Sequence, residues 1–200
     1  MSEHLFADDV LFLQRFLKSG RLYAGKLDGV WGPLTDAGHE AFLAQSDAIA
    51  AELGRFDGRS ERLIASLQLP AQRSARGFLA RVRAAGIDAR LVSGTRSYGE
   101  QNMLYRRGRF GNPPPKVTNA RGGQSNHNFA IAWDIGVFEG GAYIPDDPKP
   151  YRRAAEIGLT QGLEWGGSWK TFPDLPHYQL AVPFSVAQTR GRFEAGEPYF

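Results

Sequence analysis

Two of the four histidines lie close in sequence to carboxylates. His127 precedes Asp134 by seven residues in SNHNFAIAWD, and His177 follows Asp174 by three residues in FPDLPH. Two histidines and one aspartate form a three-ligand set that leaves a fourth tetrahedral position for water, as in catalytic zinc sites. These residue types therefore indicate metal-assisted hydrolysis.

The spacing does not by itself bring His127 to Asp134. Seven extended residues span about 23 Å, and the two side chains would point to opposite faces of a strand. A shared metal therefore requires a bend, which the small residues Ala130 and Ala132 permit.

Two prolines flank the second pair. Pro173 and Pro176 disfavour a regular helix, so Asp174 and His177 are predicted to share a rigid turn. If Asp134 is the third ligand, Asp174 is left as a base beside the water. The alternative is that these are loop residues whose prolines and glycines only shape turns.

Composition narrows the classes of protein. The absence of cysteine excludes disulfide scaffolds, thiolate zinc fingers, iron–sulfur clusters and cysteine nucleophiles. The net charge of +3 and the pI near 9.3 favour anionic surroundings. No run of basic and aromatic residues suggests a nucleic-acid groove, and no apolar run is long enough for membrane insertion. We expect His4 and His39 to be exposed or to pack, not to bind a metal.

Hydrophobic spacing predicts an α+β fold, in which a small antiparallel sheet is flanked by helices and a small all-helical module precedes it. We expect the sheet and its helices to hold the zinc site. The predicted helices lie between residues 60 and 86, around 101–105 and around 151–160. The predicted strands lie at 87–92, 129–138 and 177–182, and residues 111–126 form a long functional loop.

Residues 1–47 are predicted to form the helical module. Val10, Leu13 and Leu17 recur at helical spacing, and a turn-rich LDGVWGP segment separates them from a second helix. The string LQRFLKSGRLYAGKLDGVWGPLTDAGHEAF resembles the peptidoglycan-binding module of wall hydrolases. Residues 48–58 suit a linker or the end of a helix, and residues 59–200 form a second domain.

Three ordered motifs in that domain resemble the VanY-like zinc peptidases. SNHNFAIAWD resembles the family pattern S-x-H-x-x-G-x-A-x-D, GLEWGGSWKTFPDLPHYQL resembles W-G-G-x-W followed by D-x-P-H, and SGTRSYGEQNMLYRRGR is similar to the S-G-x-R-S segment. The resemblance implies Zn²⁺ ligands His127, Asp134 and His177, a general base at Asp174, and Arg96 facing the scissile carbonyl oxygen or a substrate carboxylate.

The resemblance also implies that Ser125, Gln101 and Trp165 line the substrate cleft, whereas Trp169 is expected in the core. One position departs from the family, because Ala130 stands where glycine is usual. If the backbone there needs a positive φ, alanine costs about 1 kcal/mol and the loop geometry is in doubt.

The activity that the resemblance implies is zinc-dependent hydrolysis of bacterial peptidoglycan. Asp174 matches the branch that cleaves the L-Ala–D-Glu bond of stem peptides, since D-alanyl-D-alanine enzymes generally carry glutamate there. The alternatives are D,D-carboxypeptidase or D,D-endopeptidase activity and a non-catalytic wall-binding protein. We expect a monomer made in the cytoplasm without a signal peptide, which acts on the wall after holin-type release or injection.

Overall fold

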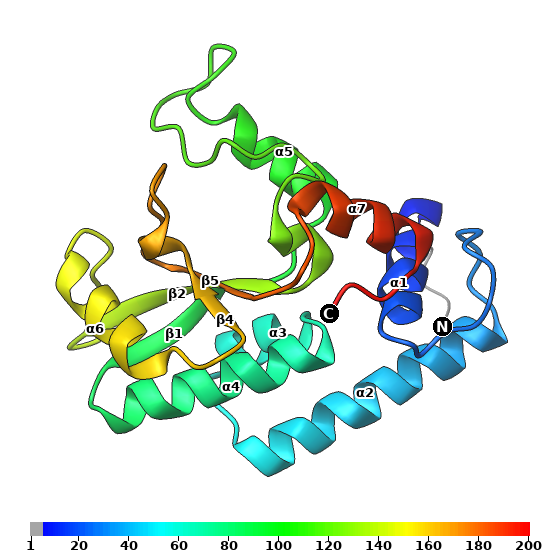
Figure 1. Ribbon diagram of the computed structural model, residues 1–200, viewed down its shortest axis with the longest axis horizontal. Coiled ribbons are helices and arrows are strands. Elements are labelled where there is room, and N and C mark those ends of the chain that lie inside the picture. Colours follow the sequence, from blue (N-terminus) through cyan, green and yellow to red (C-terminus); the bar gives the residue numbers. More distant parts are fainter. Residues whose placement is uncertain (1–5) are drawn as a thin grey trace.

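The computed structural model describes residues 6–200, so His4 lies outside the described residues. The chain is α+β, as predicted, and Figure 1 shows its elements in order. The helices are α1 (Ala7–Ser19), α2 (Pro33–Leu53), α3 (Gly58–Ala65), α4 (Leu69–Ala84), α5 (Tyr98–Arg106), α6 (Pro148–Gly158) and α7 (Val186–Ala195). The strands are β1 (Asp88–Ser93), β2 (Ala132–Glu139), β3 (Ala142–Tyr143), β4 (Leu163–Trp165) and β5 (His177–Leu180). Short 3₁₀ helices η1 (Asn126–Phe129) and η2 (Gly166–Ser168) precede β2 and follow β4.

The five strands form one antiparallel sheet in the order β1-β2-β5-β4, with β3 paired to β2. Alternation along β2 and β5 gives this sheet two different faces. Trp133 pairs with Tyr178 and stacks on it, and Tyr178 packs against Phe78 of α4, with ring centroids 4.3 Å apart. That face lies in the core, so the next residue of each strand points to the opposite face.

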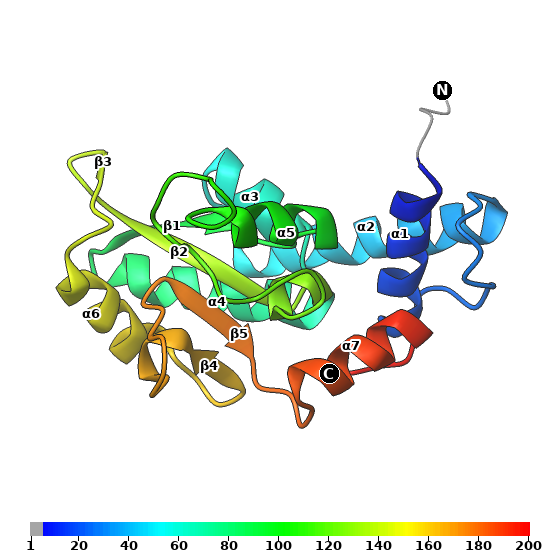
Figure 2. The ribbon, with the colours of Figure 1, turned by 90° about the horizontal axis from the view of Figure 1, so that it is seen from above.

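The N-terminal helices share the main hydrophobic core. Phe16 and Phe42 belong to the same buried cluster as the sheet residues, and Phe12 of α1 contacts Phe193 of α7. Gln68 at the start of α4 donates a hydrogen bond of 2.9 Å to the Phe16 carbonyl. Figure 2 shows α1 beside α7 and α2 running along the same layer as α4. Residues 7–53 therefore pack against the rest of the protein as part of one core.

The segment 48–58 is mostly helical. α2 continues to Leu53, and residues 54–57 then lead to Gly58, where α3 begins. Residues 48–53 are therefore the end of a helix, and the connection between α2 and α3 is four residues long. No helix within residues 6–200 is long and apolar enough to cross a membrane.

Candidate active site

The register of the sheet places two of the expected ligands side by side. Asp134 of β2 is paired directly with His177 of β5. Because Trp133 and Tyr178 face the core, Asp134 and His177 project from the opposite face. The Asp134 carboxylate oxygen Oδ1 lies 3.1 Å from His177 Nδ1.

η1 and a left-handed residue supply the bend that brings in His127. The chain turns at Ala130, which has φ 58° and ψ 29°, so the backbone does need a positive φ at this position. Phe129 packs against Phe193 of α7, which holds η1 on the protein. The turn places His127 Nε2 3.1 Å from Asp134 Oδ1 and 3.2 Å from His177 Nδ1.

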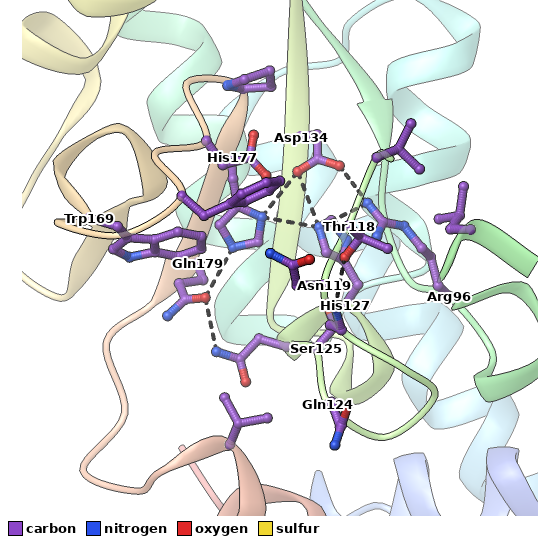
Figure 3. Close-up of a pocket in the computed structure, with 18 of the residues that line it drawn as sticks. Arg96, Thr118, Asn119, Gln124, Ser125, His127, Asp134, Trp169, His177 and Gln179 are labelled. Carbon is purple, nitrogen blue, oxygen red and sulfur yellow. Dashed lines mark hydrogen bonds and ion pairs between the residues drawn. The ribbon is translucent and has the colours of Figure 1, made fainter. Parts of the chain in front are cut away.

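These three groups are the one cluster of possible metal-binding side chains found in residues 6–200, and their donor atoms lie within 4.8 Å of one another. Both histidines are buried, with exposed fractions of 1% for His127 and 5% for His177. Figure 3 shows His127, Asp134 and His177 converging from η1, β2 and β5.

Hydrogen bonds on the far side of each imidazole determine which nitrogen carries the proton. His127 Nδ1 lies 2.7 Å from the Gly94 carbonyl, which can only accept, so Nδ1 carries the proton and Nε2 has a lone pair. His177 Nε2 lies 3.0 Å from Gln179 Oε1. Glu164 orients that amide by accepting 2.7 Å from Gln179 Nε2, so Oε1 faces the imidazole. His177 Nδ1 is therefore the atom with the lone pair.

In the neutral histidines, two imidazole lone pairs and a carboxylate oxygen thus converge. Arg96 Nη2 borders two of these groups, at 3.1 Å from His127 Nε2 and 2.6 Å from Asp134 Oδ2. It does not lie between His127 Nε2 and His177 Nδ1, which are 3.2 Å apart, so a cation between them would relieve their repulsion. Ligand atoms about 2.0–2.1 Å from a small tetrahedral ion are about 3.3 Å apart, close to the 3.1–3.2 Å separations of these donor atoms. The donor set and its spacing therefore fit a divalent transition metal bound by two imidazoles and a carboxylate.

The pKa directions differ between the two histidines. Burial lowers the pKa of His127, although Asp134 opposes this shift. Burial alone would raise the pKa of Asp134, but the neighbouring His127 and His177 hold it well below its usual value. Burial alone would lower the pKa of His177, but the hydrogen bond and charge of Asp134 raise it overall. The raised pKa of His177 and the lowered pKa of Asp134 favour a charged pair, whereas the lowered pKa of His127 favours the neutral imidazole.

Arg96 borders this cluster and is held by several partners. Its Nη2 donates 2.6 Å to Asp134 Oδ2, which leaves Oδ1 to face the histidines. Its Nε donates to Ser93 Oγ and its Nη1 to Gln101 Oε1, each at 3.0 Å. Arg96 is therefore fixed at the cavity wall by groups from β1, α5 and β2.

Asp174 lies on the loop between η2 and β5 and is not part of the metal cluster. Its backbone N–H donates to the Gly166 carbonyl at 3.0 Å, and its own carbonyl accepts from the His177 N–H at 3.3 Å. A Cβ at Gly166 would lie 2.6 Å from the Asp174 carbonyl oxygen, so this turn needs glycine. Burial raises the pKa of the Asp174 carboxyl, and the charge of Asp134 adds to the shift.

A cavity of about 770 Å³ opens over the cluster. Arg96, Asp174 and the three clustered residues line it, as does Ser125, one of the three expected cleft residues. Trp169 also lines it and is 36% exposed, with its ring centroid 5.0 Å from that of His177. The expectation that Trp169 lies in the core is therefore wrong, because η2 turns the ring toward the cavity (Figure 3).

The other two expected cleft residues, Gln101 and Trp165, are not among the residues that line the cavity. Gln101 is fully buried, and it holds Arg96 while donating 3.0 Å to the Ala120 carbonyl. Trp165 donates from Nε1 to the Leu175 carbonyl at 2.8 Å and does not contribute to the cavity lining. In this structure Gln101 positions Arg96, and Trp165 fastens the loop that carries Asp174.

Sequence reasoning missed the group that orients His177. Gln179 follows His177 by two residues on the same strand, so strand periodicity places both side chains on one face. That signal could have identified Gln179. The Gly94 carbonyl that orients His127 has no side-chain signal, because it depends on how the chain turns after β1.

Comparison with known proteins gave three findings. Residues 118–180 match a family model described as D-alanyl-D-alanine carboxypeptidase. The chain is 40% identical over 106 residues to the peptidoglycan L-alanyl-D-glutamate endopeptidase CwlK of Bacillus subtilis. The aligned region covers 48% of this chain and 62% of that protein. The chain thus matches less than two thirds of that relative's length. The solved structure of the Serratia marcescens L-Ala D-Glu endopeptidase ChiX is 29% identical, covers 66% of this chain and 92% of that chain, and has a TM-score of 0.47.

Proposed function

Since the chain belongs to the VanY-like M15 peptidase family, we propose that it is a zinc-dependent peptidoglycan endopeptidase that cleaves the L-Ala–D-Glu bond of wall stem peptides. The observation that carries the proposal is the convergence of three unprotonated donor atoms at 3.1–3.2 Å on the floor of an open cavity. The named activity of the Bacillus subtilis relative supports the choice of bond.

His127, Asp134 and His177 would hold the metal. Zn²⁺ in that position would supply a Lewis acid that lowers the pKa of a water molecule toward 7 and polarises the scissile carbonyl. The Gly94 carbonyl and Gln179 keep the two imidazoles in the tautomers that bind a cation.

Asp174 would act as the general base and then as the general acid. Its carboxyl lines the cavity and is not a member of the metal cluster, so it is available to accept a proton from the attacking water. The same group would return the proton to the leaving nitrogen of D-glutamate. Burial raises the pKa of this carboxyl toward neutral pH, which suits a group that first accepts a proton and then donates it.

Arg96 would stabilise charge on the substrate. The hydrogen bonds to Ser93, Gln101 and Asp134 fix the guanidinium before substrate binds, so little reorganisation is needed when the carbonyl oxygen becomes negative. Ser125 lines the cavity and would contact the peptide backbone.

The second candidate is cleavage of a D-Ala–D-Ala bond at the same site, favoured by the description of the matching family model. The aspartate at position 174 supports the L-Ala–D-Glu reading instead, because D-alanyl-D-alanine enzymes generally carry glutamate there. We also propose that the helical module of residues 1–47 contributes attachment to the wall, and that the protein reaches the wall through holin-type lysis or injection.

A metal-removal experiment tests the proposal. Elemental analysis of protein purified without chelator should find about one equivalent of zinc. Chelator treatment should abolish cleavage of a soluble N-acetyl-L-Ala-γ-D-Glu-L-Lys-D-Ala peptide, and one equivalent of Zn²⁺ should restore it. Full activity in metal-free protein would contradict the assignment.

A further inference from the structure

The positive charge of the chain is concentrated in one segment beside the cavity. Between Glu100 and Asp134 there are no acidic residues and five basic ones: Arg106, Arg107, Arg109, Lys116 and Arg121. These five contribute +5, whereas the other 19 basic and 21 acidic residues of the chain sum to −2. We call residues 105–121 the basic loop.

The cations of the basic loop are not neutralised by neighbouring carboxylates. No carboxylate of residues 6–200 lies within 4.0 Å of any of the five, although many other arginines of the protein form such pairs. Arg106, Arg107 and Lys116 are exposed. Their charges are therefore available to an anion from outside the chain.

Arg109 gives the basic loop a defined shape. Its guanidinium donates to the carbonyls of Tyr105 at 2.7 Å and Thr118 at 2.9 Å, and to Asn119 Oδ1 at 2.9 Å. It also lies over the Tyr105 ring, 4.2 Å from the centroid, and Arg121 lies over the same ring at 5.0 Å. These contacts tie the end of the loop to its beginning.

The C-terminal part of the basic loop contributes to one wall of the cavity. Residues 117–120 line the cavity, and Lys116 and Arg121 flank them in sequence. The loop between η2 and β5 contributes Trp169 and Phe172 to the cavity lining, and Figure 1 shows this loop across from the basic loop. That second wall contains one lysine and one aspartate, so it carries no net charge. The two sides of the cavity therefore differ in charge.

We propose that the basic loop binds the free α-carboxylate of D-glutamate, on the far side of the scissile bond from L-alanine, and so sets the direction in which the stem peptide lies in the cavity. This inference rests on the proposed function. A glutamate attached through its nitrogen has two carboxyl groups beyond the scissile bond, of which one continues the peptide and the other can remain a free carboxylate. The alanine side offers a methyl group and an amide, neither of which is charged.

Two matched peptides test the proposal. The first is N-acetyl-L-Ala-γ-D-Glu-L-Lys-D-Ala, and the second is its twin with the free α-carboxyl of D-glutamate converted to a carboxamide. The wild-type protein should cleave the carboxylate peptide with a kcat/KM about fivefold to tenfold higher, the scale expected for two exposed charge contacts. Raising NaCl from about 20 to about 500 mM should compress that ratio toward one, because salt screens exposed charges.

Paired double variants locate the effect. Arg107→Gln/Lys116→Gln removes two exposed cations of the basic loop and should bring the ratio for the two peptides close to one, while cleavage of the carboxamide peptide is kept. Lys149→Gln/Arg152→Gln removes the same two residue types from the exposed surface of α6 and should preserve the wild-type ratio. Thermal melting of each variant confirms that the fold is intact.

The outcomes separate this inference from the proposed function. If neither peptide is cleaved at the L-Ala–D-Glu bond, the proposed function fails and this inference with it. If both peptides are cleaved equally well by the wild-type protein, the function stands and the inference is wrong. An unchanged ratio in Arg107→Gln/Lys116→Gln, together with weaker binding to intact walls, would overturn it in favour of an anionic wall polymer as the ligand.

Discussion

Gln179→Leu tests the chain of hydrogen bonds that prepares His177 for a metal. Leucine is similar in size to glutamine but offers no acceptor to His177 Nε2, which lies 3.0 Å from Gln179 Oε1. The imidazole can then adopt the other tautomer, with its proton on Nδ1 directed at Asp134 Oδ1, 3.1 Å away. Zinc would have to displace that proton before it could bind.

Two independent estimates give a similar magnitude. A buried donor that loses its partner costs about 1–3 kcal/mol, and His177 is only 5% exposed. Loss of a hydrogen-bond partner of a metal-binding histidine lowers metal affinity about 10- to 100-fold, equivalent to about 1.4–2.8 kcal/mol. We therefore expect Gln179→Leu to bind zinc about 10- to 100-fold more weakly.

The assay is competition for zinc between the protein and a chromophoric chelator, with thermal melting of the metal-free variant as a check on folding. Glu164→Gln is the control, because glutamine can still accept from Gln179 Nε2 and keep its amide in the same orientation. The control should change affinity far less. Wild-type zinc affinity in correctly folded Gln179→Leu would refute the tautomer argument.

Three further changes have defined outcomes. Asp174→Asn should retain zinc and melting temperature, because Asp174 lies outside the cluster, but kcat should fall about 100-fold or more; loss of zinc would make Asp174 a ligand. Deleting residues 1–53 should lower the melting temperature sharply, because Phe16 and other residues of α1 and α2 belong to the shared core; an unchanged melt would show that the remainder folds independently. Glu61→Gln should destabilise the protein by about 3 kcal/mol at pH 7, because Glu61 accepts from both Nη atoms of the buried Arg76 at 2.8 Å. Burial alone would raise the pKa of Glu61, but Arg76 lowers it below the ordinary 4.5, so this stability is present above pH 4.5 and is lost as the pH falls further; a difference in melting temperature that persists at pH 2 would contradict this.

The parts of the site that sequence could predict are those with local signals. His127, Asp134 and His177 stand out by residue type, and the turn shared by Asp174 and His177 follows from the two prolines. The structure also bears out the concern about Ala130, whose φ is 58°. The α+β class follows from irregular alternation of helical and extended patterns.

The parts that sequence reasoning missed depend on how distant segments pack. Trp169 carries the same apolar ring in a core as on a cavity wall, and only the turn at η2 decides between them. Gln101 is polar, which favours a cleft, but its burial beneath Arg96 depends on tertiary packing. The helix α7 was not among the predicted helices, although it had a local signal, since Ser185 and Gln188 form a capping box at its start.

Mass spectrometry of purified peptidoglycan after digestion tests the central claim most directly, because new chain ends identify the bond that was cleaved. The account predicts fragments with a new D-glutamate N-terminus and matching fragments that end in L-alanine, absent from a digest with His177→Ala. Release of terminal D-alanine with the L-Ala–D-Glu bond intact would contradict it.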